Sequence, residues 1–144
     1  MKVASILKAK GTGVKTTSPL TTIATAARML RDHHIGALVV TEWGGGVQGI
    51  ITERDIVHGL ADRGSELLDL PIATVMTRTP ATCTPDDDIQ KVMSRMTRLR
   101  VRHLPVIVDG RLQGIVSIGD VVKHRLDELE LETNVLRDAF IARQ

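Results

Sequence analysis

The apolar positions of this 144-residue chain predict the same order of elements twice. Residues 14–18 and 80–84 are short extended pieces, each ending in a hydroxyl residue before a proline, and a residue in that position disfavours helical angles. A helix is predicted after each piece, because apolar residues recur three and four positions apart over residues 23–30 and 89–96. Two strands and a second helix follow in each half.

The two strands of each half are predicted to form a hairpin. Residues 35–40 are a continuous apolar run, which is typical of a strand buried on both faces, and residues 101–108 are its counterpart. Since proline cannot donate to a strand ladder, Pro105 predicts an edge strand or a bulge in the second half. The turns at residues 43–46 and 109–111 contain the glycine that such turns favour. The return strands are expected at residues 47–51 and 112–116.

The two halves are copies of one unit. Gly-Ile-Ile-Thr-Glu-Arg-Asp at residues 49–55 returns 65 residues later as Gly-Ile-Val-Ser-Ile-Gly-Asp at residues 114–120. Each half alone would bury only a marginal core, so we expect the halves to share one core. The predicted fold is an α/β or α+β sandwich of two units related by a pseudo-twofold axis. The predicted boundaries are 1–69 for the first repeat, 70–126 for the second and 127–144 for a helical extension.

The last helix is predicted to run without Gly or Pro from about Val121 to Arg143, roughly 35 Å at 1.5 Å per residue. It carries an apolar row at heptad-like spacing, with one polar member. Two interpretations are open: the helix packs on its own domain, or the row is a seam for self-association. The apolar row consists of Val122, Leu126, Leu129, Thr133, Leu136 and Phe140.

Composition narrows the possible functions. The net charge is only +2, and the chain has one Trp, one Phe and no Tyr, so it lacks the aromatic platforms that single-stranded nucleic acid needs, and nucleic acid is not an expected partner. With no long apolar run and no secretory pattern at the start, we expect no membrane span and a cytoplasmic location. The single cysteine, Cys83, is predicted to be a small buried hydrophobe, and the spacing of the five histidines predicts no metal site.

The repeated turns, Thr52–Asp55 and Ser117–Asp120, carry the candidate chemistry. A hydroxyl residue with an acid three positions later is typical of a capping box at a helix start. The same turn offers free N–H groups and the positive helix end to a phosphate, and its carboxylate can accept hydrogen bonds from ribose hydroxyls. Capping and nucleotide binding both remain open. Catalysis is not expected, because no Ser-His-Asp, Cys-His or metal constellation accompanies the turns.

From about Val3 to Arg125 the chain resembles a tandem pair of cystathionine-β-synthase (CBS) domains, the Bateman module. The resemblance rests on the motif Gly-h-h-[Ser/Thr]-x-x-Asp (h, apolar) occurring twice, on the hydroxyl-Pro pieces and on the strands at 35–40 and 102–106. It implies a regulatory module that binds AMP, ADP or ATP, with NAD(H) or S-adenosylmethionine as further candidates. It also implies a homodimer that signals to an unidentified protein in trans, because no catalytic, channel or transporter domain lies within these residues.

The resemblance further implies two pseudo-symmetric clefts, each drawing on both repeats. Ligand contact and a half-buried strand position are both open for His103, as are phosphate neutralisation and an exposed structural role for Arg54. The alternatives to a nucleotide sensor are an interaction module without a ligand and a redox- or metal-responsive regulator. One cleft is expected to contain Asp120, Ser117, Ser18, Ile35, Gly36, His103 and Ile115. The other is expected to contain Asp55, Thr52, Arg54, Thr84, Val101, Arg102, Ala37 and Ile50.

Overall fold

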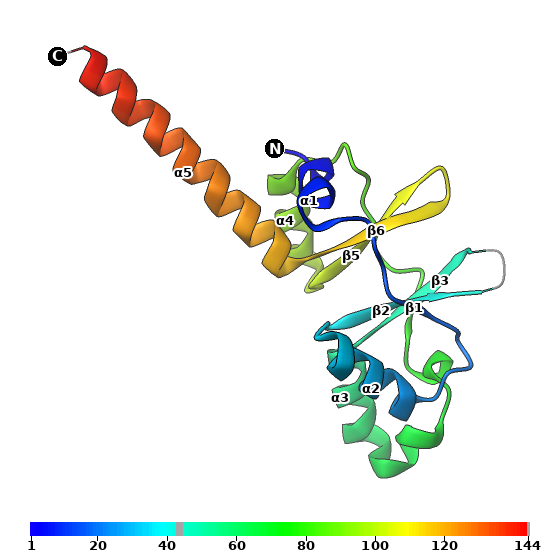
Figure 1. The fold of residues 1–144 in the computed structure, drawn as a ribbon. Helices are drawn as coiled ribbons and strands as arrows, with labels where there is room; N and C mark the ends of the chain where they lie inside the picture. The colour runs from blue at the N-terminus through cyan, green and yellow to red at the C-terminus, as the bar shows by residue number, and fades with distance from the viewer. Residues whose placement is uncertain (43–44, 144) are drawn as a thin grey trace.

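The computed structural model describes residues 1–42 and 45–143, and its elements follow the predicted repeat (Figure 1). The first repeat contains β1 (Thr16–Thr17), α2 (Ile23–His33), β2 (Ala37–Thr41), β3 (Val47–Thr52) and α3 (Glu53–Arg63). The second contains α4 (Ile89–Leu99), β5 (His103–Val108), β6 (Arg111–Ser117) and α5 (Ile118–Ala142). The remaining elements are α1 (Val3–Lys10), the 3₁₀ helices η1 (Gly64–Asp69) and η2 (Ile72–Thr74), and the strand β4 (Thr77–Arg78). The predicted mixed α and β fold is confirmed.

The strands form one sheet of four and one of two. The larger sheet has the order β1-β2-β3-β4, with β1 parallel to β2 and the other pairs antiparallel. In the second repeat the counterpart of β1 is reduced to one parallel bridge between Cys83 and Val106. The strand β4, which the apolar pattern did not predict, pairs with Gly49 and Ile50.

Of the two alternatives expected for Pro105, the structure has the bulge, while the outer side of the strand is paired only by the bridge to Cys83. Its strand β5 is paired with β6 alone, apart from the Cys83 bridge, and the register shifts between Val106 and Ile107. The Pro105 carbonyl accepts a hydrogen bond from Cys83 N at 3.0 Å. Because the nitrogen and carbonyl of one strand residue point to the same side, the nitrogen that lacks a proton also faces away from β6. No ladder bond to β6 is lost.

Local chemistry explains the hairpin turns and the helix ends. Asp109 and Gly110 have φ values of 50° and 76°, as a two-residue loop with two left-handed positions requires. The predicted turn at 43–46 lies partly outside the described residues, since 43 and 44 are not among them. The helices α2 and α4 both end at a left-handed residue, His34 and Arg100, which occupy equivalent places in the repeats. Asp88 caps α4 by accepting from Gln90 N at 2.8 Å.

The buried side chains form two clusters, so the prediction of a single shared core is wrong. The first-repeat cluster contains Ile23, Leu38 and Ile51, and the second-repeat cluster contains Ile89 and Leu104. Each cluster also includes a segment from outside its own repeat. From residues 1–69, the helix α1 supplies Val3, Ile6 and Leu7 to the second cluster, and from residues 70–126, Ile72 and Met76 belong to the first cluster.

Backbone hydrogen bonds fix this exchange at equivalent points. Val3 N donates to the Asp87 carbonyl at 2.9 Å, just before α4 begins. In the other repeat, Ile72 N donates to the Thr21 carbonyl at 2.8 Å, just before α2 begins. Isolated bridges reinforce both joins, between Lys2 and Asp88 and between Thr22 and Pro71. Each repeat therefore packs against a segment that belongs, in sequence order, to the other repeat.

The helix α5 packs on its own domain only over its first turns, and the remainder projects from the body (Figure 1). Val121 is fully buried, and Glu128 forms ion pairs with Arg125 and with the Met1 amino group. Beyond this point the apolar row is exposed: Leu136 is 71% exposed and Phe140 is 65% exposed. Over the described parts of the chain, 1–42 and 45–143, no helix combines the length and the apolar character needed to cross a membrane.

Two equivalent glycines provide a matched test of the packing between strands and exchanged segments. A Cβ on Gly49 would lie 2.5 Å from the Thr77 carbonyl oxygen, which is backbone, whereas a Cβ on Gly114 would lie 2.7 Å from the tip of the Leu7 side chain. We expect Gly49→Ala to lower the free energy of unfolding by about 1–3 kcal/mol, as overpacking does. Gly114→Ala should cost less, because Leu7 can rotate. Urea denaturation of both variants measures the difference, and equal losses would contradict this account.

Candidate functional site

Both repeated turns are complete capping boxes, so the capping interpretation is correct. Thr52 Oγ1 accepts from Asp55 N at 3.2 Å, and Asp55 Oδ2 accepts from Thr52 N at 3.0 Å. Ser117 Oγ accepts from Asp120 N at 3.1 Å, and Asp120 Oδ2 accepts from Ser117 N at 2.9 Å. Each box uses one oxygen of its carboxylate. Capping therefore fixes the orientation of each acid without using all of its capacity to accept hydrogen bonds.

The Asp55 cleft, a cavity of about 230 Å³, lies between the two repeats. Its volume is slightly below the roughly 300–1,000 Å³ of most small-molecule sites. Arg54 spans the repeats, since its Nη1 donates to the Arg100 carbonyl at 3.2 Å. The predicted residues that line this cleft are Asp55, Thr52, Arg54, Val101, Arg102 and Ile50. Residues that the sequence did not predict here are Gly36, Glu53, Thr77, Pro80, Ala81, Arg100 and His103.

The Asp120 cleft is larger, about 430 Å³, and also lies between the repeats. Asp120 itself is not a lining residue, whereas Lys10, which contacts it, is one. The predicted residues that line the cleft are Ser117, Ile35, Gly36, His103 and Ile115. Residues that the sequence did not predict here are Lys10, Gly13, Val14, Lys15, His33, His34 and Ala37.

Besides Asp120, three predicted residues do not line the clefts to which they were assigned. Ser18 is exposed and its Oγ accepts from Leu20 N at 3.2 Å, within the turn that precedes α2. Thr84 is exposed in the equivalent turn of the second repeat, where its N–H donates to Asp87 Oδ2 at 2.9 Å. Ala37 lines the Asp120 cleft, although it was expected in the Asp55 cleft.

Gly36 and His103 separate the two clefts and line both of them. A Cβ on Gly36 would lie 3.1 Å from His103 Cε1, so the imidazole rests directly on the glycine backbone. Burial of the ring lowers the pKa of His103, with smaller and opposing effects from Glu53 and Lys10. The imidazole is therefore neutral at pH 7 and offers one donor and one acceptor. His103 is half-buried and lines both clefts, a position compatible with either of the two interpretations from the sequence.

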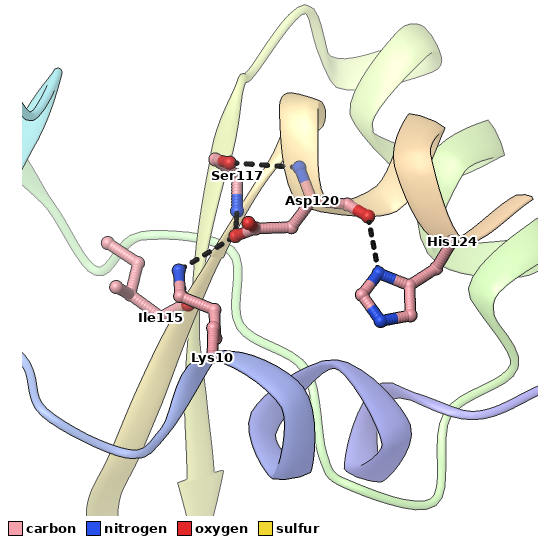
Figure 2. A network of polar contacts seen from close by, with 5 residues as sticks. All are labelled: Lys10, Ile115, Ser117, Asp120 and His124. Atoms are coloured by element: carbon pink, nitrogen blue, oxygen red, sulfur yellow. Dashed lines mark hydrogen bonds and ion pairs between the residues drawn. The ribbon is translucent and has the colours of Figure 1, made fainter. Parts of the chain in front are cut away.

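Lys10 links the helix α1 to the second capping turn (Figure 2). Its Nζ donates to Asp120 Oδ2 at 2.7 Å and to the Ile115 carbonyl at 3.0 Å. Partial burial would raise the pKa of Asp120, but the hydrogen bonds from Lys10 and Ser117 outweigh it, so the pKa of this carboxyl lies below its ordinary value. On the far side of the turn, His124 Nδ1 lies 3.0 Å from the Asp120 carbonyl oxygen. Sequence reasoning missed Lys10, because no local pattern indicates that α1 packs against the second repeat.

Cys83 has the environment of a structural residue. It is 2% exposed, and burial raises the pKa of its thiol to about 12. Since the thiolate is the reactive form, this environment gives no support to a redox-responsive role. Within residues 1–42 and 45–143, no group of three His, Cys, Asp or Glu side chains is placed to hold a metal ion.

Comparison with known proteins agrees with the repeats seen in the structure. A family model described as the CBS domain matches residues 11–62 and 72–127. An uncharacterised 17.7 kDa protein of Acidianus ambivalens is 39% identical over 117 residues, which cover 81% of this chain and 70% of that protein. The predicted tandem pair of CBS domains is confirmed.

Solved structures have the same arrangement. The CBS-domain containing protein ATU1752 from Agrobacterium tumefaciens superposes with a TM-score of 0.85 at 43% identity, covering 87% of this chain and 99% of that chain. The CBS domain pair of protein MJ0100, in complex with 5′-methylthioadenosine and S-adenosyl-L-methionine, has a TM-score of 0.79 at 28% identity, covering 89% and 98% of the two chains.

The contact between Lys10 and Asp120 predicts a measurable change in acid–base behaviour. Lys10→Met should raise the pKa of Asp120 toward its ordinary value of about 4. Because the folded pKa is depressed, the pair stabilises the fold above about pH 4, and this contribution disappears as the pH falls through the folded pKa. Both side chains are partly exposed, so the loss at pH 7 should not exceed about 1 kcal/mol.

Carbon-detected NMR titration of the aspartate carboxyls measures this pKa directly. Lys8→Met, an exposed change on the same helix, is the matched control and should leave the pKa of Asp120 unchanged. An unchanged pKa in Lys10→Met would show that the ion pair does not persist in solution.

Proposed function

This chain belongs to the CBS-domain family, and from that premise we propose that it is a regulatory module that binds an adenosine-containing ligand between its two repeats. The observation that carries the proposal is the pair of clefts, each walled by both repeats and each beside a carboxylate held by a capping turn. A carboxylate that keeps a free oxygen can accept hydrogen bonds from the two hydroxyls of a ribose. The apolar walls provided by Ile50, Val101, Ile35 and Ile115 suit the flat face of a base.

We propose adenine nucleotides, AMP, ADP or ATP, as the ligands within this class. The similarity to the MJ0100 pair, which was solved with two adenosine derivatives, supports the adenosine part. Cationic side chains on the cleft walls support the phosphate part, since Lys and Arg are the usual phosphate partners. These cations are Arg54, Arg100 and Arg102 in the Asp55 cleft, and Lys10 and Lys15 in the Asp120 cleft. In this proposal the chain acts by binding and signalling rather than by catalysis, and the regulated protein acts in trans.

We propose that the module signals as a homodimer, with the apolar row of α5 as part of its interface. Leu126, Leu129 and Leu136 lie on one face of the helix at a/d spacing and are exposed. In a parallel, in-register pair of helices, a g residue lies next to the e residue five positions later in the second copy. With Leu126 at position a, this rule places Glu132 beside Arg137 of the second copy and pairs opposite charges. Thr133 would then face Thr133 of the second copy, so that the polar position of one row meets the polar position of the other.

Ligand-induced stabilisation tests the binding proposal. AMP at a hundred times its dissociation constant should raise the free energy of unfolding by about 2.7 kcal/mol for one site. Asp120→Asn and Asp55→Asn keep the shape of each cap but remove a charged acceptor, so each should weaken binding at its own cleft by roughly ten- to a hundredfold. Asp88→Asn is the matched control, because Asp88 caps α4 and lines neither cleft.

Thermal unfolding followed by isothermal titration calorimetry supplies both measurements. If AMP, ADP and ATP leave the melting temperature unchanged, or if Asp88→Asn weakens binding as much as the two cleft variants, the proposal fails. The interaction module without a ligand would then be the better interpretation.

Sedimentation velocity tests the dimer. Leu136→Glu places a charge in the apolar row and should shift the protein toward the monomer. Leu131→Glu is the matched control, since Leu131 is exposed on the same helix but lies on the opposite face from the row. A dimer that both variants leave intact would exclude the row from the interface, and a monomeric wild-type protein would refute the dimer itself.

A further inference from the structure

The two clefts are not chemically equivalent, because only one of the two acids is held by a lysine. The exchanged segments occupy matching places, since Leu7 approaches Gly114 and Met76 approaches Gly49. Three residues further along the chain, the same position is Lys10 in one segment and the uncharged Thr79 in the other. Lys10 pairs with Asp120 (Figure 2), whereas no ion pair to Asp55 occurs within the part of the chain that the structure describes.

Lys10 stands where a ribose would approach Asp120. Its Nζ holds Asp120 Oδ2 at 2.7 Å and the Ile115 carbonyl at 3.0 Å, and both Lys10 and Ile115 line the cleft. A ligand whose hydroxyls donate hydrogen bonds to Asp120 must share the carboxylate with the Lys10 ammonium or displace the ammonium. Displacement leaves the ammonium without its charged partner, which costs free energy in a partly buried site.

A phosphate group on the ligand offsets that cost. A lysine side chain is flexible and its ammonium is a compact charge, so it can move from a carboxylate to a nearby phosphate and remain paired. The charge of the other lining residues favours an anion as well: Lys15 lies on the wall, and neither Asp nor Glu is among the lining residues. An adenosine derivative without an anionic group, such as 5′-methylthioadenosine, gives the displaced ammonium no charged partner.

We propose that Lys10 makes the Asp120 cleft selective for adenosines that carry phosphate over those that do not. The inference rests on the proposed function and narrows the ligand class at one of its two clefts. It also distinguishes this chain from the MJ0100 pair, whose structure contains 5′-methylthioadenosine, which has no phosphate, and S-adenosyl-L-methionine, which carries a sulfonium cation.

Calorimetric titration with AMP and with 5′-methylthioadenosine tests the proposal. The Asp55→Asn protein is the background, so that binding at the Asp120 cleft dominates the signal. We expect this protein to prefer AMP, and the addition of Lys10→Met should reduce the ratio of the two affinities by about tenfold, the equivalent of one ion-paired hydrogen bond. Lys10→Arg should keep the preference. Lys8→Met, which removes an equal charge from the same helix outside the cleft, should leave the ratio unchanged.

The possible results separate this proposal from the one on which it rests. If AMP binds and Lys10→Met leaves the affinity ratio at the Lys8→Met value, Lys10 is not the selective residue, while the nucleotide-binding function stands. If the wild-type protein binds neither compound, the proposed function fails and this inference fails with it. Because the measured quantity is a ratio between two ligands on one variant, a general loss of stability in Lys10→Met would not produce the expected change.

Discussion

The exchange of segments between the two repeats is the constraint on which the rest of the structure depends. A unit of about sixty residues buries too little surface to be stable with a wide margin. Here each unit gains apolar side chains from a segment of the other: Val3, Ile6 and Leu7 complete the second core, and Ile72 and Met76 complete the first. Separating the repeats would therefore expose residues in both cores at once.

The contact between Gly36 and His103 then determines how the two clefts relate. Both residues lie at the starts of equivalent strand regions, and the ring lies so close to the glycine that a Cβ there would make a tight contact of 3.1 Å with His103 Cε1. The same two residues thus form part of the wall of both clefts. Any ligand that moves the His103 ring in one cleft must also change the wall of the other, which gives the molecule a direct physical route for coupling between its sites.

Features fixed by neighbouring residues could be predicted from the sequence, whereas features fixed by long-range packing could not. The capping turns at Thr52 and Ser117, the helices that follow Pro19 and Pro85, and the bulge near Pro105 each follow from a few adjacent residues. The packing of α1 against the second core could not be predicted in this way, because its apolar residues would suit either core equally well.

Two errors follow from this limit. One core was predicted where the structure has two, because composition indicates how many apolar residues can be buried but not which of them pack together. Lys10 was overlooked for the same reason: its role exists only once α1 has crossed to the other repeat. Ser18 and Thr84 show the converse case, because each forms a hydrogen bond within its own turn: the Ser18 hydroxyl accepts from Leu20 N, and the Thr84 backbone N–H donates to Asp87.

The capping boxes explain why structural and ligand-binding roles need not compete at these turns. A side chain that is free to rotate loses conformational entropy when a ligand binds to it, whereas Asp55 and Asp120 are already held by the amides of Thr52 and Ser117. The hydrogen bond that stabilises the helix start therefore also preorganises the acid. The two turns are alike in this respect and differ in what else reaches the carboxylate. At Asp55 the preorganised acid is open to a neutral hydroxyl, while at Asp120 it already holds a cation, so identical motifs present different chemistry to a ligand because of one residue from a distant segment.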